Sequence, residues 1–208
     1  DLAFITNPTS MHVETAIKLV KAKCNIFIEK PISHNMKNLK SLIKLIKLKK
    51  VFCAVGFQTR YDELLSKIKK IILKKKYGKI KSVYIEHRHY LPYHHKYEDY
   101  KKSYAANKNL GGGVLLCFSH ETDYANYLFG EPRRISSKIF FSKKLNINVE
   151  SQAIFKIIYK NNIKVNFNLD FLKKKPSRYC AIEFEKAKLK WNLLKNKILI
   201  KKKKKNII

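Results

Sequence analysis

The first 60 residues alternate short apolar runs with stretches in which apolar side chains recur every three or four positions. The runs at 2–6, 24–28 and 51–57 predict buried strands, and the stretches between them predict helices. Thr9 or Ser10 is expected to cap the first of these helices, and Ser33 or Asn35 is expected to start the second. Strands and helices that alternate in this way predict a parallel α/β sheet with right-handed crossovers. Parallel sheets are covered on both faces and usually have more strands, so this block is typical of part of a larger sheet.

The next 70 residues follow a different pattern. An amphipathic helix is predicted over 62–76 and an alternating strand over 79–90. A polar and aromatic loop follows over 91–110. After it, three glycines that begin at Gly111 lead into an apolar stretch, which predicts a single buried helix ending at Phe129.

From 135 to 200 the alternation of apolar and polar residues predicts four or five antiparallel strands. Helices followed by such strands indicate an α+β domain. We therefore expect two domains, one over residues 1–60 and the other over 61–208. The chain opens at Asp1 inside an apolar run and closes on a lysine-rich tail, so we expect a longer protein of which both ends are missing.

The formal net charge of +31 rests almost entirely on lysine. The chain has 46 Lys and Arg residues, of which five are Arg. Proteins that recognise nucleic acid favour Arg, whose planar guanidinium makes bidentate hydrogen bonds. This lysine-rich composition therefore does not predict nucleic-acid binding. Lys, Ile and Asn share A/T-rich codons, and a biased genome accounts for their abundance. The positive field still attracts anions such as a sugar nucleotide or NADP.

Four widely spaced cysteines sit in apolar runs, which is typical of free thiols in a reducing cytoplasm. The sequence contains no run of 18 or more apolar residues, so no membrane span is predicted. Four histidines gather among tyrosines at His87, His89, His94 and His95. No acidic residue or cysteine has matching spacing, so we expect no metal site there.

Glu29-Lys30-Pro31 ends the second predicted strand, which places Lys30 at the carboxyl end of that strand. Ligands of open α/β sheets bind at the carboxyl ends of the strands. A lysine at this edge can hold a substrate hydroxyl and stabilise the charge that develops on its oxygen. Asn7 and Pro8, with His12 after them, end the first strand at the same edge, and the helix that follows offers free backbone amides. The alternatives are a surface lysine and an ordinary turn.

His120 and Asp123 interrupt the apolar helix after the glycines and share one helical face. Burying such a pair is costly unless it is hydrogen-bonded or takes part in chemistry. Histidine is the natural proton acceptor for an alcohol oxidised near neutral pH. The alternative is a histidine bonded within the core.

These motifs together resemble one family, the Gfo/Idh/MocA oxidoreductases. The segments that carry the resemblance are Ile5–Pro8 with His12, Ile28–Pro31, Val55–Gln58 with Arg60 and Tyr61, Gly78–Ile80, Gly111–Leu116, His120–Tyr124, Leu128–Pro132, Lys175–Arg178 and Leu189–Trp191. The resemblance implies the C-terminal part of a Rossmann parallel sheet, followed by an α+β domain with an open antiparallel sheet that binds a sugar and forms a homo-oligomer. It implies NAD or NADP as cofactor.

The resemblance also implies roles for individual residues. Lys30 would contact both the nicotinamide and the substrate hydroxyl, and His120 would be the acid/base. The other residues implied at the nicotinamide are Asn7, Pro8, His12, Glu29, Pro31 and Gln58. The other residues implied at the substrate are Arg60, Tyr104, Lys108 and Asp123. The segment around Tyr104 and Lys108 resembles a subgroup from surface-polysaccharide and amino-sugar biosynthesis.

Two departures from the family pattern matter. The glycine-rich phosphate loop and the acidic residue that follows it are absent. Many members also carry an Asp three or four residues before the histidine, where this chain has Cys117 and Leu116. The proton relay is then either shortened or taken over by Glu121 or Asp123.

Three hypotheses follow: part of an active sugar dehydrogenase, a non-catalytic remnant that binds or oligomerises, and a basic nucleic-acid-binding protein. The first predicts that Lys30 and His120 converge on one cleft, about 4–8 Å apart once substrate is bound.

Overall fold

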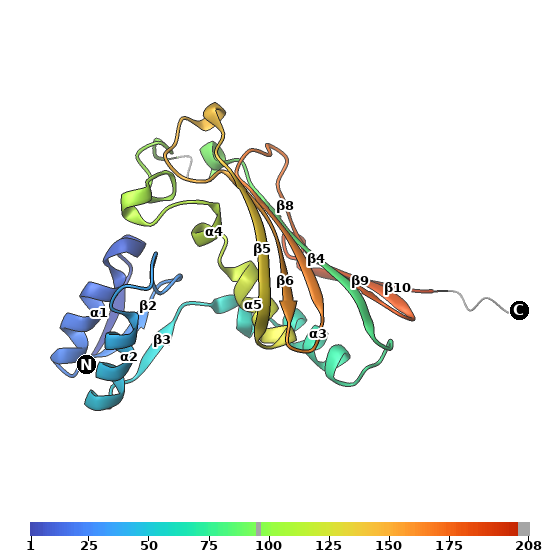
Figure 1. Cartoon of the computed structure of the whole chain (residues 1–208), viewed down its shortest axis with the longest axis horizontal. Coiled ribbons are helices and arrows are strands. Elements are labelled where there is room, and N and C mark those ends of the chain that lie inside the picture. Colours follow the sequence, from blue (N-terminus) through green and yellow to red (C-terminus); the bar gives the residue numbers. More distant parts are fainter. Residues whose placement is uncertain (95–96, 204–208) are drawn as a thin grey trace, which may run out of the picture.

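The structure, a computed structural model, describes residues 1–94 and 97–203; His95 and the end of the lysine tail lie outside them. Two lobes are visible in Figure 1. The small lobe carries a three-stranded sheet with its helices, and the large lobe carries a seven-stranded sheet.

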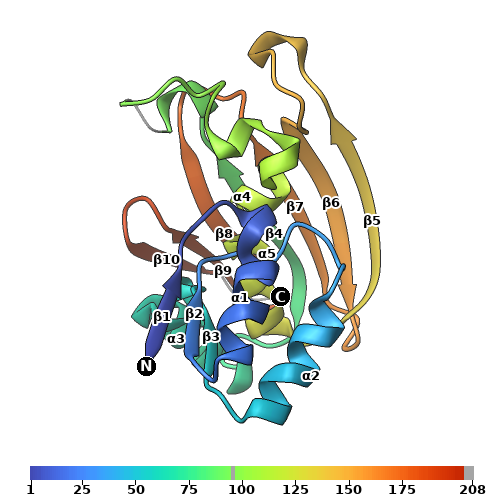
Figure 2. The same cartoon turned by 90° about the vertical axis from the view of Figure 1, so that its left-hand side faces the viewer.

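The small lobe is a parallel α/β unit, as the pattern predicts. Its strands are β1 (Leu2–Ile5), β2 (Asn25–Ile28) and β3 (Cys53–Val55), and its helices are α1 (His12–Lys21) and α2 (Leu39–Lys49). The strands lie in the order β1-β2-β3, and both pairs are parallel. Right-handed crossovers between neighbours in this order place both helices on one face of the sheet, towards the viewer in Figure 2.

The two faces of this small sheet differ in burial. Ile26 and Ile28 are fully buried under the helices, together with Leu42 of α2. On the opposite face Leu2 and Phe4 are 53% and 66% exposed. An apolar face of this kind, next to the unpaired edge of β1, is typical of part of a larger sheet.

The starts of both helices differ from the sequence-based expectation. Neither Thr9 nor Ser10 caps α1, because a 3-10 turn over Thr9–Met11 precedes it and its first bond runs from the Met11 amide to the Pro8 carbonyl. The second helix starts at Leu39 rather than near Ser33 or Asn35, since turns and bends fill residues 30–38.

A short link connects the lobes. A 3-10 turn over Gln58–Tyr61 leads into α3 (Glu63–Leu73), and the Asp62 side chain caps this helix by accepting from the amides of Leu64 and Leu65. The helix is four residues shorter than predicted, and it buries Leu65 and Ile68 against the large sheet.

The large sheet is mixed rather than wholly antiparallel. Its order is β10-β9-β8-β4-β7-β6-β5, and the central pair β4–β7 is parallel. The strands are β4 (Ile80–Arg88), β5 (Pro132–Phe140), β6 (Gln152–Tyr159), β7 (Lys164–Asp170), β8 (Ser177–Phe184), β9 (Ala187–Asn192) and β10 (Lys197–Lys202). Six strands thus replace the four or five predicted after residue 130. The prediction undercounted because the two-residue turn at 185–186 carries no glycine, proline or asparagine.

The apolar stretch after the glycines forms two helices instead of one. They are α4 (Val114–Cys117) and α5 (His120–Phe129), and they pack on the inner face of the sheet. Gly112 is required just before them, because a side chain there would collide with the carbonyls of Tyr104 and Ala105. The core beneath them includes the fully buried Trp191 and Phe167.

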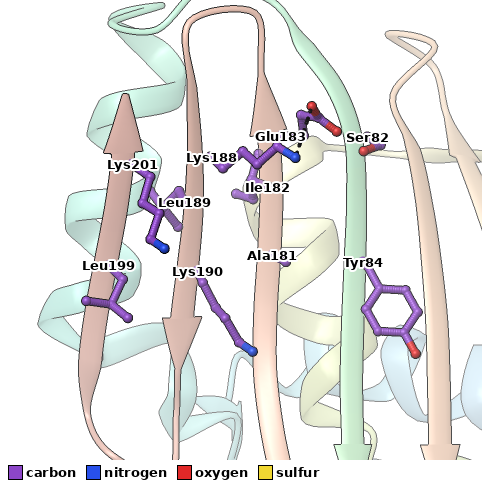
Figure 3. Close-up of a pocket in the computed structure, with 10 residues that line it drawn as sticks. All are labelled: Ser82, Tyr84, Ala181, Ile182, Glu183, Lys188, Leu189, Lys190, Leu199 and Lys201. Carbon is purple, nitrogen blue, oxygen red and sulfur yellow. Dashed lines mark ion pairs between the residues drawn. The ribbon is translucent and has the colours of Figure 1, made fainter. Parts of the chain in front are cut away.

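The outer face of the large sheet carries no helix in the described part of the chain. It bears charged and polar side chains around a shallow hollow of about 410 Å³, including Tyr84, Glu183, Lys190 and Lys201 (Figure 3). The sheet is therefore open on this side, as expected.

Candidate functional site

The ends of β1 and β2 are joined by a buried histidine. His12 Nδ1 lies 2.9 Å from the carbonyl oxygen of Pro31, and Nε2 lies 2.8 Å from that of Asn7. The ring is almost fully buried. His12 thereby fixes the two loops that carry Asn7 and Lys30, and its ring nitrogens are occupied by the backbone.

These loops form one wall of a cavity of about 240 Å³. Its lining residues are Thr6, Asn7, Pro8, Thr9, His12, Glu29, Lys30 and Tyr104. The cavity therefore brings together most of the predicted cofactor residues and two predicted substrate residues, Lys30 and Tyr104. It is smaller than the usual site of a whole drug-sized ligand, so it suits one end of a dinucleotide.

The Asn7 side chain is suited to bind a carboxamide group. Its side-chain nitrogen donates to the Thr15 hydroxyl at 3.0 Å, which fixes the orientation of the amide. Its Oδ1 is buried and has no partner among the described residues. A nicotinamide carboxamide carries the N–H donors that such an oxygen accepts.

Lys30 reaches from the small lobe to the large one. Its Nζ donates to the carbonyl oxygen of Cys117 at 2.9 Å. Cys117 stands where the resemblance leads us to expect an Asp, and burial raises the pKa of its thiol to about 12. The thiol therefore stays protonated near neutral pH and cannot replace a carboxylate as proton acceptor.

His120 is the first residue of α5 and is 7% exposed. Burial, and then the positive charge of Lys30, lower the pKa of His120 to about 4. The ring is thus neutral near pH 7, and its buried Nδ1 has no partner in the described chain. The Phe57 ring packs edge-on against it, with centroids 5.8 Å apart. Lys30 bonds to the backbone three residues before His120; a cleft that both side chains share, and their spacing around a substrate, stay predictions.

The lowered pKa of His120 has a consequence for stability. Between about pH 6.5 and 4 the unfolded chain holds a proton on this residue and the folded chain does not, so stability falls as the pH drops through this window. Because of His120, the wild type should lose on the order of 3 kcal/mol of its free energy of unfolding across this window, and His120→Gln should not show this loss. Urea unfolding of both proteins at pH 7 and pH 4.5 measures it. If the two proteins lost the same free energy of unfolding between pH 7 and pH 4.5, the expectation would be contradicted.

Arg60 and Asp123, both predicted to bind substrate, bind each other. Arg60 Nε donates to Asp123 Oδ2 at 2.8 Å, and Nη2 donates to Oδ1 at 2.6 Å. Both carboxylate oxygens are therefore used, which leaves Asp123 poorly placed to serve His120 as a relay. The pair ties the link between the lobes to α5, and a direct role in substrate binding stays a prediction.

Glu121 is the other acidic residue beside His120. It is fully buried, and its Oε1 accepts from Arg178 Nε at 2.7 Å and lies 3.2 Å from His87 Nδ1. Burial alone raises the pKa of Glu121, but His87 and Arg178 outweigh it and lower the value to about 2. Glu121 is therefore a carboxylate that remains ionised next to the candidate base.

Sequence reasoning missed His87 and Arg178. They lie directly opposite each other on β4 and β8, and both project to the inner face of the sheet below α5. The register of β4 with β8, which no local motif encodes, brings them to Glu121. Gln58 and Lys108 are exposed and do not line the cavity, so their roles stay predictions.

Among the described residues no group of three or more His, Cys, Asp and Glu side chains is placed to hold a metal ion. None of the helices described here is long and apolar enough to cross a membrane.

Comparison with curated proteins finds inositol dehydrogenases. The chain is 29% identical over 135 residues to scyllo-inositol 2-dehydrogenase (NAD(+)) of Bacillus subtilis, a match that covers 62% of this chain and 35% of that protein. It is 30% identical over 132 residues to myo-inositol 2-dehydrogenase of Thermotoga maritima, covering 63% and 36%.

Solved structures share the fold over the whole chain. The WlbA dehydrogenase of Bordetella pertussis, in complex with NADH and UDP-GlcNAcA, superposes with a TM-score of 0.86 at 18% identity, covering 100% of this chain and 60% of that one. A levoglucosan dehydrogenase, in complex with NADH and levoglucosan, gives 0.85 at 19%, covering 99% and 58%. The chain thus spans about three fifths of the length of these structures.

Each lobe matches the sequence pattern of a known protein family. Residues 1–57 match the oxidoreductase family with an NAD-binding Rossmann fold, and residues 65–190 match the GFO/IDH/MocA C-terminal domain. The second match alone covers more than half of the chain. This protein therefore belongs to the Gfo/Idh/MocA oxidoreductase family.

Proposed function

We propose that this chain forms the nicotinamide-binding and substrate-binding parts of an NAD(P)-dependent oxidoreductase that acts on a hydroxyl of a sugar or sugar nucleotide. The observation that carries the proposal is that Lys30, which lines a cavity with an unpartnered Asn7 amide oxygen, bonds to the backbone at Cys117, three residues before the buried and neutral His120. Membership of the family supports it.

The chemistry divides between cofactor and chain. NAD(P), when bound, supplies the acceptor for the hydride that leaves the alcohol carbon. Asn7 Oδ1 would accept from the carboxamide and so orient the ring. Lys30 would donate to the substrate hydroxyl, and its charge favours the alkoxide that develops there. His120, neutral near pH 7, would take the hydroxyl proton.

The relatives narrow the class of substrate. The curated relatives are named as inositol dehydrogenases, and the solved structures hold levoglucosan or a UDP-linked sugar. All of these ligands present hydroxyls on a ring. The segment at Tyr104 and Lys108 favours surface-polysaccharide or amino-sugar biosynthesis as the setting.

The 208 residues alone are expected to bind NAD and NADP weakly. The family holds the diphosphate at a glycine-rich turn and helix N-terminus that this sequence does not contain. Its cavity offers only a nicotinamide end. We expect a Kd above about 1 mM by calorimetry, which means a binding free energy weaker than about 4 kcal/mol. Micromolar binding would contradict this.

The proposed function is tested on the complete reading frame that contains these residues. The expressed protein is incubated with NAD or NADP and a panel of inositols, sugars and sugar nucleotides, and absorbance at the reduced-nicotinamide band is followed. Turnover of one of these ring alcohols, with formation of its ketone, supports the proposal. A correctly folded protein that reduces neither cofactor with any of them supports the non-catalytic alternative.

We also propose that the open outer face of the large sheet pairs with a second copy. Its hollow, its half-buried Tyr84 and its exposed Lys190 and Leu199 form a broad surface that no helix of the described chain covers (Figure 3). Sedimentation of the complete protein is expected to give a closed oligomer. Glu183→Lys, which adds positive charge to this face, should shift the equilibrium towards monomer, whereas a monomeric wild type would contradict the proposal.

A further inference from the structure

Two Arg–carboxylate pairs hold the first turn of α5, and they differ in how much of the guanidinium they use. Arg60 gives Nε and Nη2 to the two oxygens of Asp123, so the prongs that face this partner are occupied. Arg178 gives only Nε, to Oε1 of Glu121. Its Nη2 is buried and finds no partner in the part of the chain that the structure describes.

Other unpartnered polar atoms lie around the same turn. Ser119 Oγ, His120 Nδ1 and Glu121 Oε2 are all buried, and none has a hydrogen-bond partner within the described ranges. Native proteins rarely leave buried polar groups unpaired, and a concentration of them at one place points to a missing polar ligand.

The positive charge of Arg178 acts on the candidate base, His120. Together with Lys30 it contributes to the lowered pKa of His120, and its bond to Glu121 places it beside the residue that follows His120. Of the carboxylates on α5, only Glu121 faces Arg178, since Asp123 is bound by Arg60. A guanidinium held by Nε leaves its remaining N–H groups free for a second oxygen ligand.

We propose that Arg178 is a substrate-binding residue that takes an anionic group of the sugar, a carboxylate or a phosphoryl group, next to the hydroxyl that His120 deprotonates. This inference rests on the proposed function and narrows its substrate class to acidic sugars. Glu121 acts through Arg178 as a positioning residue: it fixes the direction in which the free N–H groups point.

The test measures binding to the 208-residue chain with three probes: D-glucuronate, D-glucose 6-phosphate and neutral D-glucose. NMR shifts of the His120 ring are followed during titration at constant ionic strength. We expect at least one of the anions to bind about tenfold or more tightly than glucose, as a charge-assisted contact predicts. The anion that binds better identifies the group as a carboxylate or a phosphoryl group.

Variants separate Arg178 from the general positive field. Arg178→Gln should abolish the preference for the anion. Arg134→Gln removes the same charge from an exposed position on β5 and should retain the preference. Arg178→Gln leaves the buried Glu121 carboxylate without its guanidinium partner. The double variant Arg178→Gln/Glu121→Gln removes one positive and one negative charge together, so the net charge of the site is unchanged. It should fold and should also lack the preference.

The outcomes are distinct. A preference that survives in Arg178→Gln or in the double variant overturns the inference, as does a wild-type chain that binds both anions no better than glucose. If the preference depends on Arg178 but the complete protein oxidises no sugar, the binding role stands and the proposed function fails. If the complete protein oxidises neutral sugars and Arg178→Gln does not change kcat/KM, the proposed function stands and this inference fails.

Discussion

Turnover in the complete enzyme is expected to fall by about 10²–10⁴ when His120 is replaced by alanine, the usual contribution of a positioned acid/base. His120 is neutral near pH 7 because burial and Lys30 lower its pKa to about 4. It can therefore accept the hydroxyl proton, and no other unpaired imidazole among the residues described here is placed beside Lys30. The measurement is kcat for the oxidation of the identified substrate at pH 7, with KM determined in parallel.

A matched control is His34→Ala. His34 is exposed and bonds to the side chain of Asn35 in the loop after β2, so its loss should leave kcat within a factor of about two. A loss below tenfold for His120→Ala would remove His120 from the role of base. It would leave the family assignment unchanged.

The second large effect concerns the core of the large lobe. Phe167 on β7 is fully buried, and its ring stacks on that of Phe155 with centroids 4.4 Å apart. Truncation to alanine leaves a cavity that the sheet cannot close, so Phe167→Ala should cost about 3–5 kcal/mol. For a chain of this length the melting temperature should fall by roughly 10 °C.

The single tryptophan makes this measurement direct. Trp191 is fully buried in the same core, so its fluorescence reports urea unfolding of the large lobe in both proteins. Phe141→Ala is the control: Phe141 is 66% exposed, and its loss should change stability by less than about 0.5 kcal/mol. Equal midpoints for Phe167→Ala and wild type would contradict the stacked arrangement of the core.

Local patterns predicted the parts of this fold that local forces determine. The alternation of strands and helices in the small lobe follows from apolar periodicity. Lys30 was placed correctly because the residue after a parallel strand lies at the sheet edge. Capping was predicted wrongly, since the turn over Thr9–Met11 uses backbone bonds where side chains were expected.

The remaining features depend on contacts between distant segments. Spacing paired His120 with Asp123, yet Arg60, 63 positions earlier, takes Asp123. Glu121 gains its partners only because β4 and β8 are in register at His87 and Arg178. The parallel placement of β4 beside β7 is likewise a property of the assembled sheet.

Two hydrogen-bonded contacts cross between the lobes within a few residues of His120. One is the bond from Lys30 to the Cys117 carbonyl, and the other is the pair of Arg60 with Asp123. A ligand that draws Lys30 to itself weakens the first bond and leaves the second intact. The Phe57 ring also stays packed against His120, so the link between the lobes holds the imidazole in place while Lys30 changes its partner.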